Sequence, residues 1–209
     1  MTDDDLRVAL DGAVADPAWL AGAVHRVSVS PAAIGALFPA VSRRCGRGPL
    51  PGGGPGEAGW TVDDAGRALL LTALPMRGPA LAAAAVELYR YGDAAEKRGV
   101  LRALPWLDIG AGGVELLHDA IRTNDPRLVA AALGPYARYL ADPMWRQAVL
   151  KCVFMDIPLS LVSGLAGRAD GELGRMLADL ADERHAAGRT IPAAAAALLA
   201  QLTEAEEAG

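Results

Sequence analysis

The stretch that most restricts the fold of this chain is residues 142–158, because it is apolar on nearly every side. Asp142 is a residue type that caps helices, Pro143 suits the first helical position and Pro158 stops a helix, so the stretch predicts one helix. At 3.6 residues per turn, its apolar side chains form two stripes that point in different directions. The first stripe is Trp145, Val149, Cys152 and Met155, and the second is Leu150, Val153 and Ile157. A helix with two apolar faces needs neighbours on both, so we expect it at the centre of the core.

The composition favours helices throughout the chain. Hydrophobic residues make up 52% of the 209 residues, yet aromatic residues make up only 5%. The core must therefore be built mainly from Ala, Leu and Val, which suit close-packed helices better than strands. A chain of this length is sufficient for one substantial domain. We therefore expect a single all-α domain over residues 1–209.

The order of helical segments and turns indicates a repeat-like architecture. From residue 61 onward, apolar periodic segments alternate with short turns that contain Gly, Pro, Asn and Asp. Thr61 and Asp64 form the T-x-x-D pattern of a capping box at the start of the first of these segments. Successive helix pairs recur about every 30 residues, close to the period of α-solenoids. The prediction is a HEAT-like helical repeat, an α-solenoid-like bundle of antiparallel helix pairs.

Two segments lack the pattern of regular structure. Residues 46–59 contain Pro-Gly-Gly-Gly-Pro-Gly, which leaves few side chains to pack and predicts a flexible loop. Chain ends without apolar anchors tend to fray, and we expect this of residues 203–209. Both segments are expected to belong to the same single domain.

Charge and motifs exclude several classes of function. The net charge is −5, which is unlike the overall excess of Lys and Arg typical of nucleic-acid-binding domains, so no nucleic-acid partner is expected. No uncharged apolar run reaches the roughly 18–20 residues of a transmembrane helix, and the acidic N-terminus is unlike a secretory signal, so we expect a cytoplasmic protein. Cys45 and Cys152 have no metal-ligand spacing around them and are expected to be buried thiols. Walker A, dinucleotide-binding and zinc-protease motifs are missing from the sequence, so neither a metal nor a cofactor is expected.

Three cationic residues are expected inside the fold and mark the most promising site: Arg122, Lys151 and Arg184. Buried charges are rarely left unpaired. One alternative is that carboxylates of the chain neutralise these cations inside the fold. The other is that the cations contact an anionic ligand, since a guanidinium binds a carboxylate or a phosphate through two hydrogen bonds. The sequence leaves both alternatives open.

Three further polar residues complete the predicted ligand-binding set. Gln147 lies four residues before Lys151 and therefore on the same helical face. Asn124 and Tyr136 flank the helix that follows Arg122. If the protein is an enzyme, Lys151 and Tyr136 are the predicted catalytic residues, with Lys151 as nucleophile or base.

Six short motifs run in order over the greater part of the chain. They are S-R-R-C-G-R-G-P-L at 42–50, R-A-L-P at 102–105, R-T-N at 122–124, G-P-Y at 134–136, Q-x-V-L-K-x-x-F-x-x-x-P at 147–158 and E-R-H-A-A-G-R-T-I-P at 183–192. In their order and spacing these motifs resemble the EboA-domain family. The resemblance spans roughly residues 31–200.

The resemblance implies a role in making or moving a specialised metabolite. EboA-domain proteins are encoded in bacterial clusters with prenyltransferase, sugar-phosphate-related and hydrolase-like partners. We therefore expect a helical protein that binds a small anionic or prenylated metabolite, or the proteins of its pathway. The alternative is a metal-independent enzyme of the cyclase, dehydratase or group-transfer type in the same pathway.

Overall fold

The computed structural model of the protein describes residues 3–51 and 59–207, and these residues form a helical protein. The α-helices are α1 (Asp3–Leu10), α2 (Pro17–Val29), α3 (Ile34–Cys45), α4 (Val62–Thr72), α5 (Gly78–Tyr91), α6 (Ala94–Ala103), α7 (Val114–Arg122), α8 (Pro126–Ala132), α9 (Asp142–Phe154), α10 (Leu165–Arg168), α11 (Gly171–Ala186) and α12 (Ala193–Glu207). The 3-10 helices are η1 (Pro31–Ala33), η2 (Leu104–Trp106), η3 (Pro135–Tyr139) and η4 (Leu159–Leu161). The described residues contain no β-strand, only an isolated bridge between Pro49 and Thr61, so the all-α prediction is confirmed.

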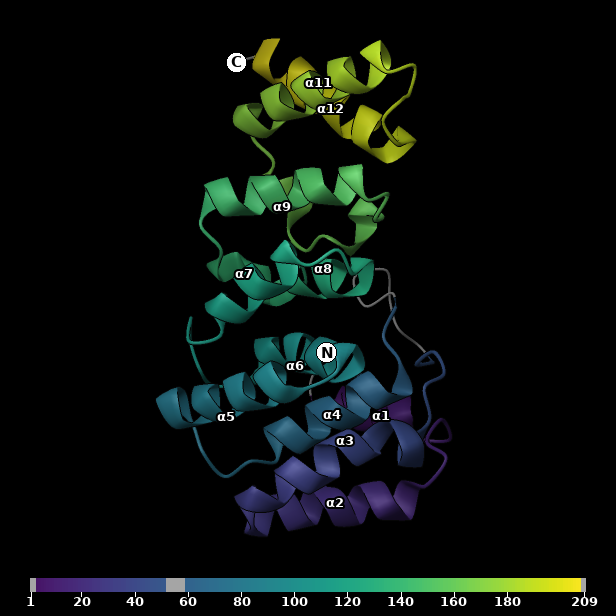
Figure 1. Ribbon diagram of the computed structural model, residues 1–209, viewed down its shortest axis with the longest axis vertical. Coiled ribbons are helices and arrows are strands. Elements are labelled where there is room, and N and C mark those ends of the chain that lie inside the picture. The colour runs from purple at the N-terminus through teal and green to yellow at the C-terminus, as the bar shows by residue number, and fades with distance from the viewer. Residues whose placement is uncertain (1–2, 52–58, 208–209) are drawn as a thin grey trace.

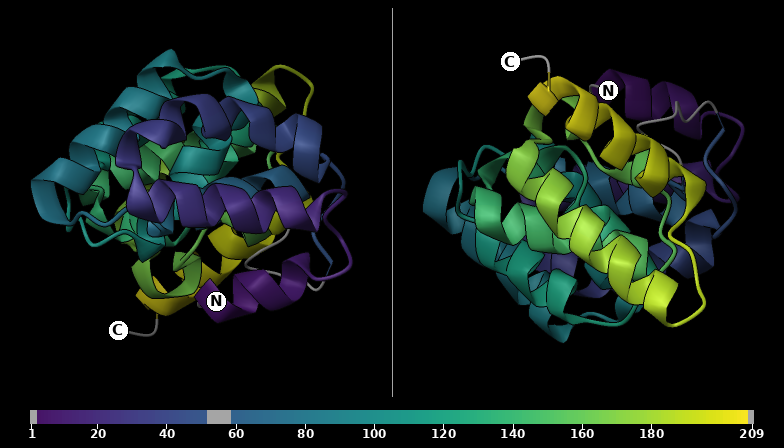
Figure 2. Two further views of the ribbon diagram at one scale, coloured as in Figure 1. Left: turned by 90° about the horizontal axis from the view of Figure 1, so that it is seen from below. Right: turned by 90° about the horizontal axis from the view of Figure 1, so that it is seen from above.

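The helices are stacked along the long axis of the molecule, broadly in chain order (Figure 1). Helices α2 and α3 lie towards one end, the α4–α6 group follows, then the α7–α9 group, and α11 and α12 form the other end. Figure 2 shows α11 and α12 side by side at that end, where α11 also contacts α9. Helix α1 departs from the order because it packs against α4. The finer assignment to a HEAT-like repeat stays a prediction.

The central helix α9 ends at Phe154, before the Pro158 that was expected to stop it. Asp156 has a left-handed backbone with φ of 56°, a conformation that Asp tolerates better than most residues. The Ile157 N–H then donates to the Cys152 carbonyl at 2.8 Å, the hydrogen bond that closes a Schellman motif. At the other end Ala141 occupies the capping position, and Asp142 is the first helical residue. Backbone hydrogen bonding at the turn, rather than proline, therefore terminates this helix.

Helix α9 is enclosed on one side and open on another. Trp145, Val149 and Cys152 have no exposed surface, as expected of the first apolar stripe. Phe154 is 68% exposed, however, and Gln147 is also exposed. The helix is therefore central to the core without being surrounded, and its open side leaves room for a cavity.

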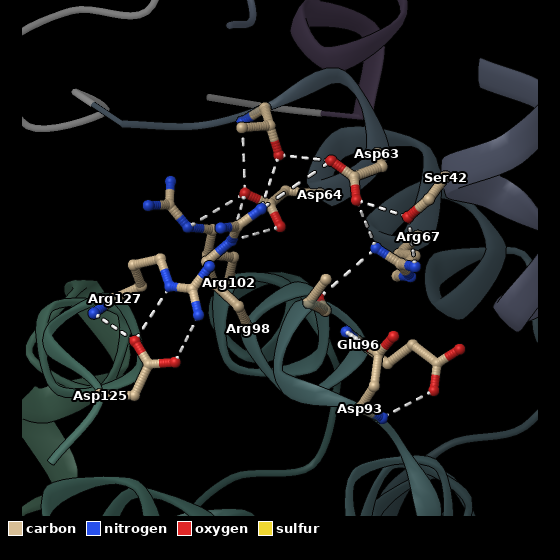
Figure 3. Close-up of polar contacts among 12 residues, drawn as sticks. Ser42, Asp63, Asp64, Arg67, Asp93, Glu96, Arg98, Arg102, Asp125 and Arg127 are labelled. Carbon is tan, nitrogen blue, oxygen red and sulfur yellow. Dashed lines mark hydrogen bonds and ion pairs between the residues drawn. The ribbon is translucent and has the colours of Figure 1, made fainter. Parts of the chain in front are cut away.

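A buried ion pair joins α3, α4 and α6 in the other half of the stack (Figure 3). Asp63 and Arg67 on α4 are each 1% exposed, and Arg67 Nη1 donates to Asp63 Oδ2 at 2.8 Å. Ser42 of α3 donates to the same oxygen at 2.7 Å and accepts from Arg67 Nη2 at 2.8 Å. A Cβ atom on Gly99 of α6 would lie only 2.7 Å from Arg67 Cδ, so glycine at this position permits the close packing of α6. The three helices thus meet around two charges inside the core.

The neighbouring Asp64 links the start of α4 to α6. Its carboxylate accepts from the Thr61 backbone N–H at 3.2 Å, and the predicted capping box is confirmed. The same carboxylate accepts from Arg98 Nε at 2.9 and 3.0 Å, and Arg98 Nη2 donates to the Thr61 hydroxyl at 2.9 Å (Figure 3). Sequence reasoning assigned Asp64 to the capping box alone and missed its connection to Arg98.

The two segments expected to be irregular are described only in part. At the edges of the loop predicted at 46–59, the Leu50 N–H donates to the Trp60 carbonyl and the Val62 N–H to the Gly48 carbonyl, both at 2.9 Å. Residues 52–58 lie outside the described residues. Helix α12 continues to Glu207, so the predicted tail is helical as far as it is described, and residues 208–209 lie outside. No helix in the described residues is long and apolar enough to cross a bilayer.

Burial alone would raise the pKa of Asp63, but hydrogen bonds from Thr61, Ser42 and Arg67 outweigh it and lower this pKa below its usual range. A carboxylate whose pKa is lower in the folded state contributes to the free energy of unfolding. The contribution is full above the unfolded pKa of about 3.9, and it is lost as the pH falls through the folded pKa. Asp63→Asn should therefore lower the free energy of unfolding by about 3–5 kcal/mol at pH 7, because Arg67 loses its buried partner. Urea unfolding should show a smaller gap between wild type and variant at pH 3.

The control for this experiment is Asp108→Asn, because the Asp108 side chain is 74% exposed and approaches Arg77 only at 3.8 Å. This variant should unfold almost like the wild type at both pH values. A gap for Asp63→Asn that is the same at pH 7 and pH 3 would contradict the role assigned to the Asp63 carboxylate.

Candidate functional site

A cavity of about 700 Å³ lies between α9 and α11, with the end of α7 at its edge. This volume is within the range of small-molecule sites. One side of its lining is apolar and consists of Ile121, Leu150, Phe154, Met155, Met176 and Leu180. The remaining lining is polar and includes three of the predicted ligand-binding residues, Asn124, Gln147 and Lys151. The structure thus brings half of the predicted set together at one surface.

Two of these polar side chains are free to bind a ligand. The amide groups of Asn124 and Gln147 make no hydrogen bond to any other described residue, and both residues are accessible at the cavity. A side-chain amide carries two donors and an acceptor. The pair can therefore hydrogen-bond a hydroxyl, carbonyl or amide group of a bound molecule.

Lys151 is largely committed to the fold. Its ammonium group donates to the Ile121 and Thr123 carbonyls, both at 2.7 Å. These carbonyls end α7, where the last helical acceptors have no partner in their own helix. An ammonium group has three donors, so one N–H is left beyond these two bonds. Lys151 therefore fixes α9 against α7 and offers the cavity at most one donor.

Arg184 has the same role in the next layer of the stack. From α11 its Nη2 donates to the Phe154 carbonyl at 2.9 Å and the Val153 carbonyl at 3.3 Å, which belong to the end of α9. Its Nη1 donates to the Thr190 carbonyl at 3.3 Å, and the nearest carboxylate, Asp156, is 3.9 Å away. Arg184 is not among the residues that line the cavity. Backbone carbonyls, rather than a carboxylate or a ligand, are its main partners.

The remaining predicted residues lie away from the cavity. The Arg122 side chain is 71% exposed and pairs with Asp119 at 3.4 Å, so its expected interior position is wrong. Tyr136 is 2% exposed, and its hydroxyl donates to the Gly110 carbonyl and accepts from the Gly113 N–H at 3.0 Å. Neither residue lines the cavity. The predicted catalytic pair requires Tyr136 and Lys151 to lie at one site. The structure does not place Tyr136 at the cavity that Lys151 lines.

The α11 side of the cavity carries three charged residues outside the predicted ligand-binding set: Arg175, Asp179 and Glu183. Arg175 Nη1 donates to Asp179 at 2.8 Å, and its other nitrogens donate to Glu172 at 2.8 and 3.0 Å. The hydrogen bonds from Arg175 to Glu172 raise the pKa of the guanidinium above its usual value. The four-residue spacing between these charges on one helical face was the available signal.

The thiols and the metal-ligating residue types of the chain do not form a site in the described residues. Nowhere in residues 3–51 and 59–207 do three His, Cys, Asp or Glu side chains come together in a way that could hold a metal ion. Cys45 and Cys152 are free and buried, as predicted. Burial raises the pKa of Cys45 to about 11 and that of Cys152 to about 12, so both remain protonated thiols near neutral pH.

The fold and the cavity define an all-α protein with an amphipathic groove between two helices. The family model of the metabolite traffic protein EboA matches residues 53–199, more than half of the chain. The chain therefore belongs to the EboA family, as the six motifs indicated. Neither curated proteins nor solved structures give a match to the chain.

The different surroundings of Arg184 and Arg122 lead to a testable contrast. Arg184→Ala should lower the free energy of unfolding by about 1.5–3 kcal/mol, because the end of α9 loses its charged hydrogen-bond donor. Arg122→Ala should leave it almost unchanged, since the side chain is exposed and its ion pair is screened by solvent. Chemical denaturation of the two variants measures the difference, and equal losses would contradict the capping role of Arg184.

Proposed function

We propose that this EboA-family protein binds a metabolite with a prenyl-type apolar chain and a neutral polar group in the cavity between α9 and α11, and carries it between the proteins of its pathway. The observation that carries the proposal is the combination of an exposed apolar wall with two unpaired amides. The description of the family as metabolite traffic proteins supports carriage rather than chemistry.

The apolar wall is suited to a flexible hydrocarbon chain. Phe154 is a large hydrophobic residue left 68% exposed, which leaves apolar surface in water unless a ligand covers it. Met155 and Met176 contribute flexible thioether side chains that adapt to irregular shapes. Covering such a wall with a hydrocarbon chain gains roughly 25 cal/mol for each Å² removed from water.

The charges around the cavity favour a neutral group over an anionic one. Lys151 and Arg175 contribute two positive charges, and Asp179 and Glu183 contribute two negative charges. Both cations are also engaged, Lys151 with carbonyls and Arg175 with carboxylates. Of the two ligand kinds expected from the sequence, the prenylated one therefore fits this cavity better than the anionic one.

Isothermal titration calorimetry with geraniol, a neutral prenyl alcohol, tests the apolar wall. Met176→Lys should weaken binding at least about tenfold, because it puts an ammonium group where the hydrocarbon chain would lie. Met144→Lys is the matched control, since Met144 is a 38% exposed methionine of α9 that does not line the cavity. It should bind geraniol like the wild type. Binding that is unaffected by Met176→Lys, or missing in the wild type, would refute the proposal.

The polar end of the cavity gives a second measurement. Gln147→Leu should weaken geraniol binding about 2–10-fold, the loss expected for one hydrogen bond to an uncharged group. It should leave the melting temperature almost unchanged, because Gln147 makes no hydrogen bond to another described residue. A geraniol affinity equal to that of the wild type would show that Gln147 does not contact the hydroxyl group of geraniol.

A further inference from the structure

The polar cluster around α4 and α6 holds more positive than negative charge. Three guanidinium groups, those of Arg67, Arg98 and Arg102, surround the carboxylates of Asp63 and Asp64. Both carboxylates are nearly fully buried, and the side chains of Arg98 and Arg102 are only 12% exposed. Counted over the described residues, the cluster thus carries one more positive than negative charge. Charges this deeply buried normally have a counter-charge.

Arg102 is the member of the cluster that makes no hydrogen bond to another described residue. Asp64 is the one carboxylate within 4.0 Å of it in the described residues, at 3.4 Å from Arg102 Nε. That carboxylate already accepts from Arg98 and from the Thr61 N–H, and the buried Arg102 Nε has no hydrogen-bond partner. In Figure 3 the ion pair with Asp64 is the only contact marked for Arg102.

Two other contacts of Arg102 within the described residues stabilise its charge without accepting a hydrogen bond. Arg102 stacks over the Trp60 ring at 5.2 Å, a cation–π contact that offsets some of the cost of burial. It also lies in the last turn of α6, where the helix dipole favours positive charge. These contacts explain why a cation is tolerated there, but neither accepts a hydrogen bond in the plane of the guanidinium. Burial lowers the pKa of Arg102 below its usual value, which reflects this incomplete compensation.

A small cavity lies beside this guanidinium. It has a volume of about 40 Å³, and its lining includes Arg102, Trp60, Leu101, Ala130, Pro135 and Leu161. A water molecule needs roughly 10–15 Å³ of such space, so the cavity has room for a head group of a few oxygen atoms but not for a large ligand. Apart from Arg102 these walls are largely apolar, and a charge between them interacts strongly with the guanidinium.

We infer that Arg102 and this cavity form a second binding site, separate from the cavity between α9 and α11, for a small oxyanion such as a carboxylate or a phosphate group. The anion supplies the negative charge that the cluster lacks and accepts two parallel hydrogen bonds from the guanidinium. Trp60 holds the guanidinium plane from one face. A ligand that carries a carboxylate or phosphate on a slender chain fits the space.

The test is calorimetric titration of the full chain with acetate and, separately, with inorganic phosphate, at pH 7 and constant ionic strength set with sodium chloride. The wild type should bind at least one of the two probes saturably at one site, and the tighter probe identifies the head group. At ten times its Kd the bound probe should raise the melting temperature by about 3–6 °C. Absence of saturable binding for both probes would overturn the inference.

Variants locate the site. Arg102→Gln should abolish binding, and Arg102→Lys should weaken it at least about tenfold, because an ammonium group keeps the charge but cannot form the paired hydrogen bonds. Ala130→Leu fills the cavity while leaving Arg102 in place, and should also abolish binding. Arg77→Gln, which removes an 85% exposed guanidinium elsewhere, should bind like the wild type. Wild-type affinity in Arg102→Lys or in Ala130→Leu would overturn the inference, whereas the outcome with geraniol has no bearing on it.

Discussion

The stack in the C-terminal half depends on cations that reach back to the helix ends of the preceding layer. The last carbonyls of a helix have no partner within it and must find one elsewhere. Lys151 of α9 serves the end of α7, and Arg184 of α11 serves the end of α9. Arg168 does the same for η3 by donating to the Ala137 and Leu140 carbonyls. The cavity between α9 and α11 exists because these contacts set the position of its two walls.

Much of this architecture could be predicted from periodicity and turn chemistry. The low aromatic content and the turn spacing predict an all-α chain, and the capping box at Thr61 is readable from two residues. The four-residue spacing of Gln147 and Lys151 places both at one cavity, because a single helix carries them and its geometry is fixed. Properties that depend on one helix were therefore accessible from the sequence.

The interaction partners of individual side chains could not be predicted from the sequence. Backbone carbonyls leave no trace in the residue types of a sequence, so the partners of Lys151 and Arg184 were sought among carboxylates and ligands. Arg122 ends a short helix whose polar side turned out to face solvent, and Tyr136 closes a turn at Gly110 and Gly113 instead of lining the cavity. The charges at Asp63 and Arg67 carried a signal, a four-residue spacing within a leucine-rich helix, but their burial follows from the packing of α3 and α6.

Tying layers together through carbonyls also has a consequence for how the sequence can vary. Every residue type carries the same carbonyl, so the acceptor positions impose no side-chain requirement of their own. Ile121 illustrates this: its carbonyl accepts from Lys151, while the residue itself lines the cavity. Substitutions that reshape the cavity wall can therefore accumulate without loosening the contacts between layers. This separation lets one helical framework vary in the wall of its cavity while its assembly is preserved.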